Sequence, residues 1–327
     1  MHVNGLERYV CPTCKVALSL TAPAEEEVLE GSLRCSRCAA EYPVRDGIPR
    51  FAPADNYAAS FGWQWNRFAR TQLDSQTGLG LTAKRFWAET RWATDLSGQT
   101  VLEAGSGAGR FTEVLATTGA RVFTFDYSAA VDANRRSNAK HSQIDFAQAS
   151  IFEIPYRSAS FDKVLCLGVI QHTPSPRAAV RALAEAVKPG GELVFDCYPI
   201  NPLTVFRGKY LLRLATAGKN PERLFPWVER WFSFWYGALG RARAVAGDPA
   251  LYLSDLVGVC DYRHELKDIP DDVLREMALL DTYDMLAPRY DKPQRRATLT
   301  RWMQEDGLVD IEVTPGYNGF EARGRKR

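Results

Sequence analysis

The sequence predicts an α/β fold built on a mostly parallel sheet, with a small metal-binding module before it and a helical insertion after it. Three observations carry this prediction. Strand patterns alternate with helical patterns between residues 99 and 198, which is typical of a parallel α/β sheet. Two C-x-x-C pairs stand near the N-terminus, and an aromatic-rich helical stretch follows the alternating region.

The composition of the 327-residue chain is that of a globular protein large enough for two or three domains. Its formal net charge of +2 argues against a nucleic-acid-binding surface. No run approaches the ~18 apolar residues of a membrane span, and the first residues lack the apolar segment of a signal peptide. We therefore expect a cytoplasmic protein with no transmembrane segment.

Two C-x-x-C pairs dominate residues 1–52, which we predict to form a zinc-ribbon domain. Cys11 and Cys14 are followed, after twenty intervening residues, by Cys35 and Cys38. Four thiolates at this spacing can surround one Zn²⁺ and leave no open position for water, so a structural site is expected. The alternative is a redox dithiol pair. The stretch resembles the small zinc-ribbon subunits that activate several tRNA, rRNA and protein methyltransferases, which implies a stabilising or docking module.

Residues 53–98 are expected to form a linker and two N-terminal helices. The aromatic side chains of the first helix share one face, and a second helical pattern runs from Ala83 to Leu96. Aromatic faces of this kind usually pack on a core. The alternative is that three residues of the first helix cover a ligand site: Trp63, Gln64 and Trp65.

A glycine-rich loop follows the first strand of the region 99–198. The stretch V-L-E-A-G-S-G-A-G-R begins at Val101, and a helical pattern follows it directly. A strand, a glycine loop and a helix together bring a ligand against bare backbone. Asp126 ends the second strand, about 20 residues on, where folds of this kind hold ribose hydroxyls.

The spacing of the glycines decides between two nucleotide cofactors. A dinucleotide fingerprint needs its third glycine at position 110, where this chain has Arg110, which disfavours a nicotinamide dehydrogenase. The pattern E-x-G-x-G-x-G, the F-D-x-V strand from Phe161 and the later P-G-G turn are similar to class I S-adenosylmethionine (SAM) methyltransferases. This resemblance spans about 100 residues and implies a Rossmann-like, seven-stranded sheet that binds SAM.

The resemblance also implies which residues bind the cofactor. The glycine loop, the acidic residue before it and the second strand end hold the methionine and ribose portions. The ends of the third and fourth strands contact the adenine and the methionine amino group. Ser150 stands where the family carries an Asp, which removes charge assistance from adenine recognition. The predicted cofactor residues are Glu103, Gly105, Ser106, Gly107, Asp126, Tyr127, Ser150, Ile151, Leu167 and Gly168.

His172 lies just beyond the fourth strand, on the edge where open α/β sheets bind ligands. A histidine there can act as a general base on a hydroxyl or phenol. The alternative is a hydrogen bond to loop backbone that fixes the turn. His172 is the predicted catalytic residue.

Residues 199–286 are expected to form a helical cap or insertion, and residues 287–327 a closing helix and the last two strands. The aromatic run L-F-P-W-V-E-R-W-F-S-F-W-Y begins at Leu224. It can close over an apolar acceptor, pack on the sheet or at a homodimer seam, or meet a membrane that carries a lipid-linked substrate. We also predict a loop facing the catalytic edge, with four candidate substrate contacts: Tyr283, Asp284, Tyr290 and Asp291.

The predicted function is methyl transfer from SAM to the oxygen or nitrogen of a small-molecule or lipid-like acceptor. An rRNA or tRNA methyltransferase is the second hypothesis, because a zinc ribbon is joined to a SAM-binding core. A non-catalytic SAM-binding scaffold is the third. The near-neutral charge and the lack of an N-P-P-Y tetrapeptide after the fourth strand disfavour the second.

Overall fold

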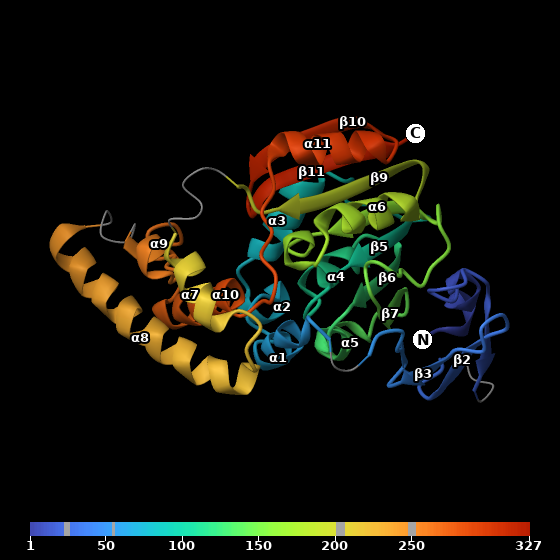
Figure 1. The fold of residues 1–327 in the computed structure, drawn as a ribbon, viewed down its shortest axis with the longest axis horizontal. Coiled ribbons are helices and arrows are strands. Elements are labelled where there is room, and N and C mark those ends of the chain that lie inside the picture. Colours follow the sequence, from blue (N-terminus) through green and yellow to red (C-terminus); the bar gives the residue numbers. More distant parts are fainter. Residues whose placement is uncertain (23–26, 54–55, 201–206, 248–252) are drawn as a thin grey trace.

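The computed structural model describes residues 1–22, 27–53, 56–200, 207–247 and 253–327. A large twisted sheet with helices on both faces occupies the centre of the molecule (Figure 1). The N-terminal ribbon lies at one end of the long axis, and a helical lobe made by α7 to α10 lies at the other.

Within the described residues, seven strands form the large sheet in the order β10-β11-β9-β8-β5-β6-β7. Five strands run parallel, whereas β11 pairs antiparallel with both β9 and β10. From β5 the chain first adds β6 and β7 on one side of the sheet and then β8 and β9 on the other side. β5 and β8 are therefore neighbours at the point where the strand order reverses, and their carboxyl ends frame a crevice. The strands are β5 (Thr100–Ala104), β6 (Arg121–Asp126), β7 (Ile144–Gln148), β8 (Phe161–Cys166), β9 (Val187–Cys197), β10 (Leu308–Gly316) and β11 (Gly319–Lys326).

Helices cover both faces of this sheet, which is why every residue of β5 and β7 is buried. α6 starts at Pro176, where the Ser175 side chain accepts a hydrogen bond from the Ala178 N–H. The helices around the sheet are α1 (Ala59–Arg67), α2 (Asp74–Thr77), α3 (Leu81–Thr90), α4 (Arg110–Leu115), α5 (Ala130–Asn138), α6 (Pro176–Ala186) and α11 (Arg296–Glu305), with a 3₁₀ turn, η2 (Ile170–His172).

The ribbon docks against the β7 edge of the large sheet. The Phe51 N–H donates to the Gln148 carbonyl at 2.7 Å, and the Tyr9 ring packs 5.0 Å from Tyr156. An open sheet edge is thereby covered. The ribbon consists of the 3₁₀ helix η1 (Val3–Arg8) and an antiparallel sheet of β1 (Leu18–Thr21), β2 (Gly31–Cys35), β3 (Glu41–Arg45) and β4 (Ile48–Pro49).

The helical lobe has a hydrophobic core of its own, centred on Phe225, Phe232 and Tyr283. Its helices are α7 (Gly208–Thr216), α8 (Pro221–Ala246), α9 (Ser254–Val257) and α10 (Asp271–Leu286). The expected loop around Tyr283 and Asp284 was therefore wrong, because α10 continues through both residues. Residues 54–55, 201–206 and 248–252, parts of the predicted linker and insertion, lie outside the described residues.

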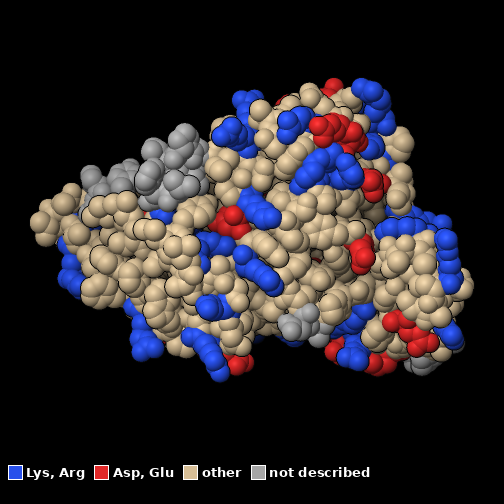
Figure 2. Space-filling view, viewed as in Figure 1, with Lys and Arg blue, Asp and Glu red and all other residues tan. Residues whose placement is uncertain are grey.

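Charged side chains are unevenly spread over the visible face of the molecule. They are frequent over the sheet and the ribbon, whereas the face of the helical lobe is mostly uncharged (Figure 2). Among the described residues, none of the helices combines the length and the apolar character that crossing a bilayer requires.

Candidate active site

The loop between β5 and α4 depends on glycine for its shape. Gly105 has φ +79° and Gly109 has φ +93°. A Cβ at Gly105 would lie 2.3 Å from the Val169 Cγ2 atom, and one at Gly109 would lie 2.1 Å from the Asn134 Oδ1 atom. No other residue fits at either position without displacing a neighbour. The predicted bare-backbone loop is therefore present.

Asp126, at the end of β6, ties this loop to the neighbouring strand. Its Oδ2 accepts a hydrogen bond from the Gly107 N–H at 2.9 Å, and its Oδ1 accepts from the N–H and hydroxyl of Ser128. Burial raises the pKa of the Asp126 carboxyl. Asp126 nevertheless lines the adjacent cavity, so lone pairs of its carboxylate remain available to a ligand.

A cavity of about 750 Å³ opens at this edge of the sheet, within the range of small-molecule sites. Ser106 has a buried hydroxyl with no hydrogen-bond partner among the described residues. Nine of the predicted site residues line the cavity: Gly105, Ser106, Gly107, Asp126, Tyr127, Ile151, Leu167, Gly168 and His172. The lining does not include Glu103 or Ser150, and a cofactor-binding role for either one stays a prediction.

Glu103 lies on β5 beneath the glycine loop. Its Oε2 accepts hydrogen bonds from the hydroxyls of Thr112 and Thr124. Burial raises the pKa of Glu103 to about 7. In this position the carboxyl group joins α4 to β6 and supports the loop from below.

His172 has a defined tautomer. Its Nδ1 lies 3.0 Å from the Tyr290 carbonyl oxygen. Because a carbonyl oxygen can only accept, Nδ1 carries a proton, and in the neutral imidazole Nε2 then carries the lone pair. Nε2 is buried and has no partner among the described residues. The rings of Phe61 and Tyr198 lie 5.3 and 5.4 Å from the imidazole ring and confine it at the cavity wall.

A buried ionic network borders the cavity beside β9. Arg85 donates to Glu89 and to Asp196, and the Gly168 N–H donates to the other oxygen of Asp196. Burial raises the pKa of Glu89 to about 7. The network fixes the conformation of Gly168, which has φ +77°, at the carboxyl end of β8.

Arg110 is the first residue after the glycine loop and also lines the cavity. It donates to the Gln72 side-chain oxygen. Burial and the nearby charge of Arg85 lower the pKa of Arg110 to about 10. In the part of the chain that the structure describes, no carboxylate forms an ion pair with Arg110. Arg110 was not predicted as a site residue, although a cation directly after a ligand-binding loop is a usable signal in the sequence.

One of the three residues proposed to cover the site does so. Trp65 lines the cavity, and a Cβ at Gly107 would lie 3.3 Å from its indole nitrogen. Trp63 instead packs against Phe225 and Tyr283 in the helical lobe. Gln64 is buried and donates to Asp284 at 2.9 Å.

The helical lobe supplies the far wall of the cavity. Lining residues come from α7, from the stretch after α9 and from α10, and they include Tyr210, Tyr262 and Asp281. The Tyr262 hydroxyl donates to Asp281 at 2.6 Å, and burial raises the pKa of Asp281 to about 6. Part of the insertion therefore borders the site, but within the described residues no member of the aromatic run that begins at Leu224 lines the cavity. A capping role for that run stays a prediction. Of the four candidate contacts, Asp284 lines the cavity, whereas Asp291 forms an ion pair with Lys209.

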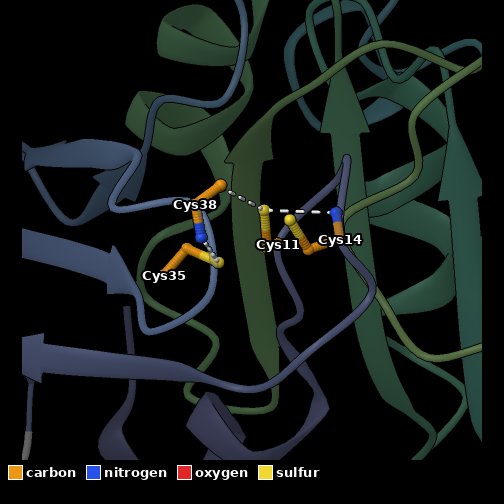
Figure 3. Close-up of side chains that lie close together, drawn as sticks. All are labelled: Cys11, Cys14, Cys35 and Cys38. Atoms are coloured by element: carbon orange, nitrogen blue, oxygen red, sulfur yellow. Dashed lines mark hydrogen bonds between the residues drawn. The ribbon is translucent and has the colours of Figure 1, made fainter.

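The four N-terminal cysteines converge at the ribbon (Figure 3). All four Sγ atoms lie within 4.8 Å of one another, and those of Cys11 and Cys38 are 3.7 Å apart. Four sulfurs about 2.3 Å from a tetrahedral Zn²⁺ would be separated by about 3.8 Å. The donor set and its spacing therefore fit a four-thiolate zinc site.

Residues 102–195 match the family described as methyltransferase domain. The chain is 33% identical over 151 residues to the ubiquinone biosynthesis O-methyltransferase of Erwinia tasmaniensis, which covers 42% of this chain and 62% of the relative. It is 34% identical over 140 residues to the Azotobacter vinelandii protein of the same name, covering 40% and 59%. The chain thus spans about three fifths of the length of these curated relatives.

Among solved structures, the chain is similar to magnesium protoporphyrin IX methyltransferase from Synechocystis PCC 6803 with bound SAH. The TM-score is 0.46 at 14% sequence identity, covering 83% of this chain and 96% of the other. The seven-stranded sheet and its order are those of class I methyltransferases. Residues 102–195, which carry the glycine loop, Asp126 and His172, therefore form a class I SAM-dependent methyltransferase domain.

Proposed function

We propose that this protein is an enzyme that transfers a methyl group from SAM to a hydroxyl oxygen of a small-molecule acceptor. The observation that carries the proposal is that the glycine loop, Asp126 and His172 all border one cavity. The relatives named ubiquinone biosynthesis O-methyltransferase support oxygen as the methylated atom.

The residues on one side of the cavity fit SAM. The bent loop leaves room for the methionine portion, and the unpartnered Ser106 hydroxyl lies beside it. We assign the ribose hydroxyls to Asp126, the adenine to Tyr127 and Ile151, and the methionine amino group to the backbone of Leu167 and Gly168. When bound, SAM supplies an electrophilic methyl group on its sulfonium.

His172 is the proposed general base. Its Nε2 lone pair is free to accept the proton of an acceptor hydroxyl, while the Tyr290 carbonyl accepts from Nδ1. That carbonyl would also stabilise the imidazolium that proton transfer creates. The lobe excludes water and holds the acceptor oxygen in line, which is where most of the catalytic advantage of such a transfer arises.

Aromatic side chains around His172 favour a flat, hydroxylated ring as the acceptor. Tyr57 packs 5.0 Å from Tyr127 and 5.5 Å from Tyr290. Tyr57, Phe61 and Tyr198 line the cavity and give it aromatic walls next to the base. Offset stacking against such walls would position a phenol or catechol.

The proposal is tested first by SAM binding and then by turnover. We expect calorimetry to detect one SAM site per chain, and an Asp126→Ala variant to bind SAM on the order of tenfold or more weakly, because it loses charged hydrogen bonds. Release of S-adenosylhomocysteine over a panel of phenols and catechols then identifies the acceptor. Failure of the wild-type chain to bind SAM would refute the proposal. Binding without turnover on any acceptor would favour the scaffold hypothesis.

We also propose that Cys11, Cys14, Cys35 and Cys38 bind one structural Zn²⁺. The support is their mutual spacing within 4.8 Å, which lets four thiolates fill a tetrahedral coordination shell. The ribbon is too small to fold on its own apolar core, so the metal would supply much of its stability. Elemental analysis of the purified chain tests the stoichiometry.

A further inference from the structure

Helix α7 has its charged face turned inward and its apolar face turned outward. On the inner face, Lys209 forms an ion pair with Asp291 at 2.8 Å, and Arg213 donates to the carbonyls of Met285 and Pro288. Both basic residues are buried. A helix on the surface of a water-soluble fold normally has the opposite polarity.

The outer face of α7 is made of leucine. Leu211 is 69% exposed and Leu214 is 86% exposed, one helical turn apart. α9 packs directly beside α7. At Gly208 the two backbones are so close that a Cβ atom would lie only 1.9 Å from the Leu256 carbonyl oxygen. That neighbour adds Leu256, 64% exposed, and Leu253, 49% exposed. We call these four leucines the apolar face; exposed apolar groups gathered in this way mark an interaction site.

The helical lobe that carries the apolar face has an excess of positive charge. Residues 207–247 contain eight Lys and Arg residues but two Glu, whereas the rest of the chain contains 33 basic and 37 acidic residues. Six of the eight remain for the surface, because Lys209 and Arg213 are buried. Along α8, exposed arginines alternate with exposed aromatic residues at helical spacing: Arg223, Trp227, Arg230 and Phe234. In Figure 2 the uncharged face of the lobe is bordered by Lys and Arg along its lower edge.

The apolar face also adjoins the active-site cavity. Tyr210, immediately before Leu211, and Asp255, immediately before Leu256, both line the cavity. Arg207, at the start of α7, lines it as well and lies 4.0 Å from Asp255. The same two segments therefore carry both the apolar face and part of the cavity wall.

We propose that the apolar face of α7 and α9 binds the surface of an anionic lipid bilayer. The leucines would enter the boundary between headgroups and acyl chains, and the arginines of α8 would contact anionic headgroups. A second copy of the chain is a poorer partner, because a twofold contact through this face would bring two positively charged surfaces together. The bilayer would deliver a lipid-soluble acceptor to the cavity.

Vesicle flotation with the metal-loaded 327-residue chain tests the proposal. We expect the wild type to float with vesicles of phosphatidylcholine and phosphatidylglycerol, and to do so less with phosphatidylcholine alone or as NaCl rises. The double variant Leu211→Ser and Leu214→Ser should bind the anionic vesicles on the order of tenfold more weakly. The triple variant Arg223→Gln, Arg230→Gln and Arg241→Gln should lose the preference for anionic vesicles.

Two matched controls lie in the ribbon, at the far end of the molecule. Leu29, 48% exposed, replaced by Ser should leave vesicle binding unchanged. So should the exposed ribbon arginines Arg34, Arg37 and Arg45 replaced together by Gln. Failure of the wild type to float, or equal flotation of the double-leucine variant, would overturn the proposal. A dimer that dissociates on the double-leucine substitution without vesicle binding would assign the face to a second copy instead. Because flotation does not require turnover, its failure is distinguishable from failure of the proposed methyl transfer.

Discussion

The proposed role of the His172 Nε2 atom as a general base can be tested by substitution. The Tyr290 carbonyl accepts from Nδ1, and the buried Nε2 has no partner among the described residues. We expect His172→Gln to lower turnover by about 10²- to 10⁴-fold, because the acceptor hydroxyl loses its base. SAM affinity should change by less than about twofold, since the amide replaces a group outside the proposed cofactor contacts.

Steady-state kinetics and SAM calorimetry on the same preparation check this expectation. His141→Gln, a histidine outside the cavity lining, is the matched control and should behave as the wild type. If His172→Gln retained full turnover while keeping its fold, the histidine would serve only to fix the turn after β8.

Burial of Glu103 should make the free energy of unfolding depend on pH in a specific way. Burial raises its folded-state pKa to about 7 from an ordinary value of 4.5. Between these two values the folded state holds a proton that the unfolded state has released, so this group makes stability fall as pH rises. The full effect is at most roughly 3 kcal/mol.

The Glu103→Gln variant isolates this effect. Without SAM, the unfolding free energy of this variant should increase relative to that of the wild type as pH rises from 5 to 8, because the glutamine does not ionise. Urea unfolding at several pH values measures the difference. A difference that stays constant across this range would show that Glu103 does not titrate there.

At the level of elements, local patterns were sufficient for the strands. β5 begins one residue before the predicted start at Val101, and β8 begins at Phe161 as predicted. Both carry apolar runs, which a strand buried on both faces leaves in the sequence. Helix ends were less accurate. The helix expected to reach Leu96 ends at Thr90, because Arg91 adopts a left-handed conformation with φ +52°. Arginine has no preference for this conformation, so the sequence does not indicate the helix end.

The candidate site divides in the same way. Residues carried by the glycine loop and by strand ends were found because spacing along the chain fixes their place. Arg85 and Tyr210 reach the cavity through contacts between distant segments, and nothing in their neighbourhood in the sequence signals it. Tertiary packing also extended α10 through Asp284, where a loop had been expected.

The loop–helix junction at Gly109 supports a prediction at the same scale. Gly109 and Gly78 both have positive φ, but a Cβ at Gly109 would meet Asn134 at 2.1 Å, whereas one at Gly78 would meet nothing within 4 Å. Gly78→Ala should therefore cost only backbone strain, about 1 kcal/mol. Gly109→Ala adds overpacking and should cost roughly 2–4 kcal/mol. Chemical denaturation checks the comparison, and equal losses would contradict it.

At the scale of the whole molecule, the ribbon and the methyltransferase domain share one hydrophobic core. That cluster runs from Leu33 in the ribbon through Tyr9 to Tyr156 and Phe161 around the large sheet. A polar path runs beside it. Arg50 donates to the Gln148 side-chain oxygen, and the Gln148 amide donates to the Tyr127 backbone carbonyl. The ribbon therefore supports a residue assigned to the adenine pocket.

Because the two parts share a core, we predict that loss of the metal from the ribbon lowers the affinity for SAM. Cys35→Ser should abolish stoichiometric zinc and lower the melting temperature by on the order of 5 °C or more, because the ribbon loses its metal-derived stability and leaves the β7 edge. SAM binding should weaken by about threefold to tenfold as Tyr127 loses its support. Cys260→Ser, a thiol outside the cluster, should keep its zinc. Calorimetric melting, elemental analysis and SAM titration on both variants separate the outcomes. If Cys35→Ser lost zinc but kept the wild-type melting temperature and SAM affinity, the ribbon would be an independent module attached to the sheet without supporting it.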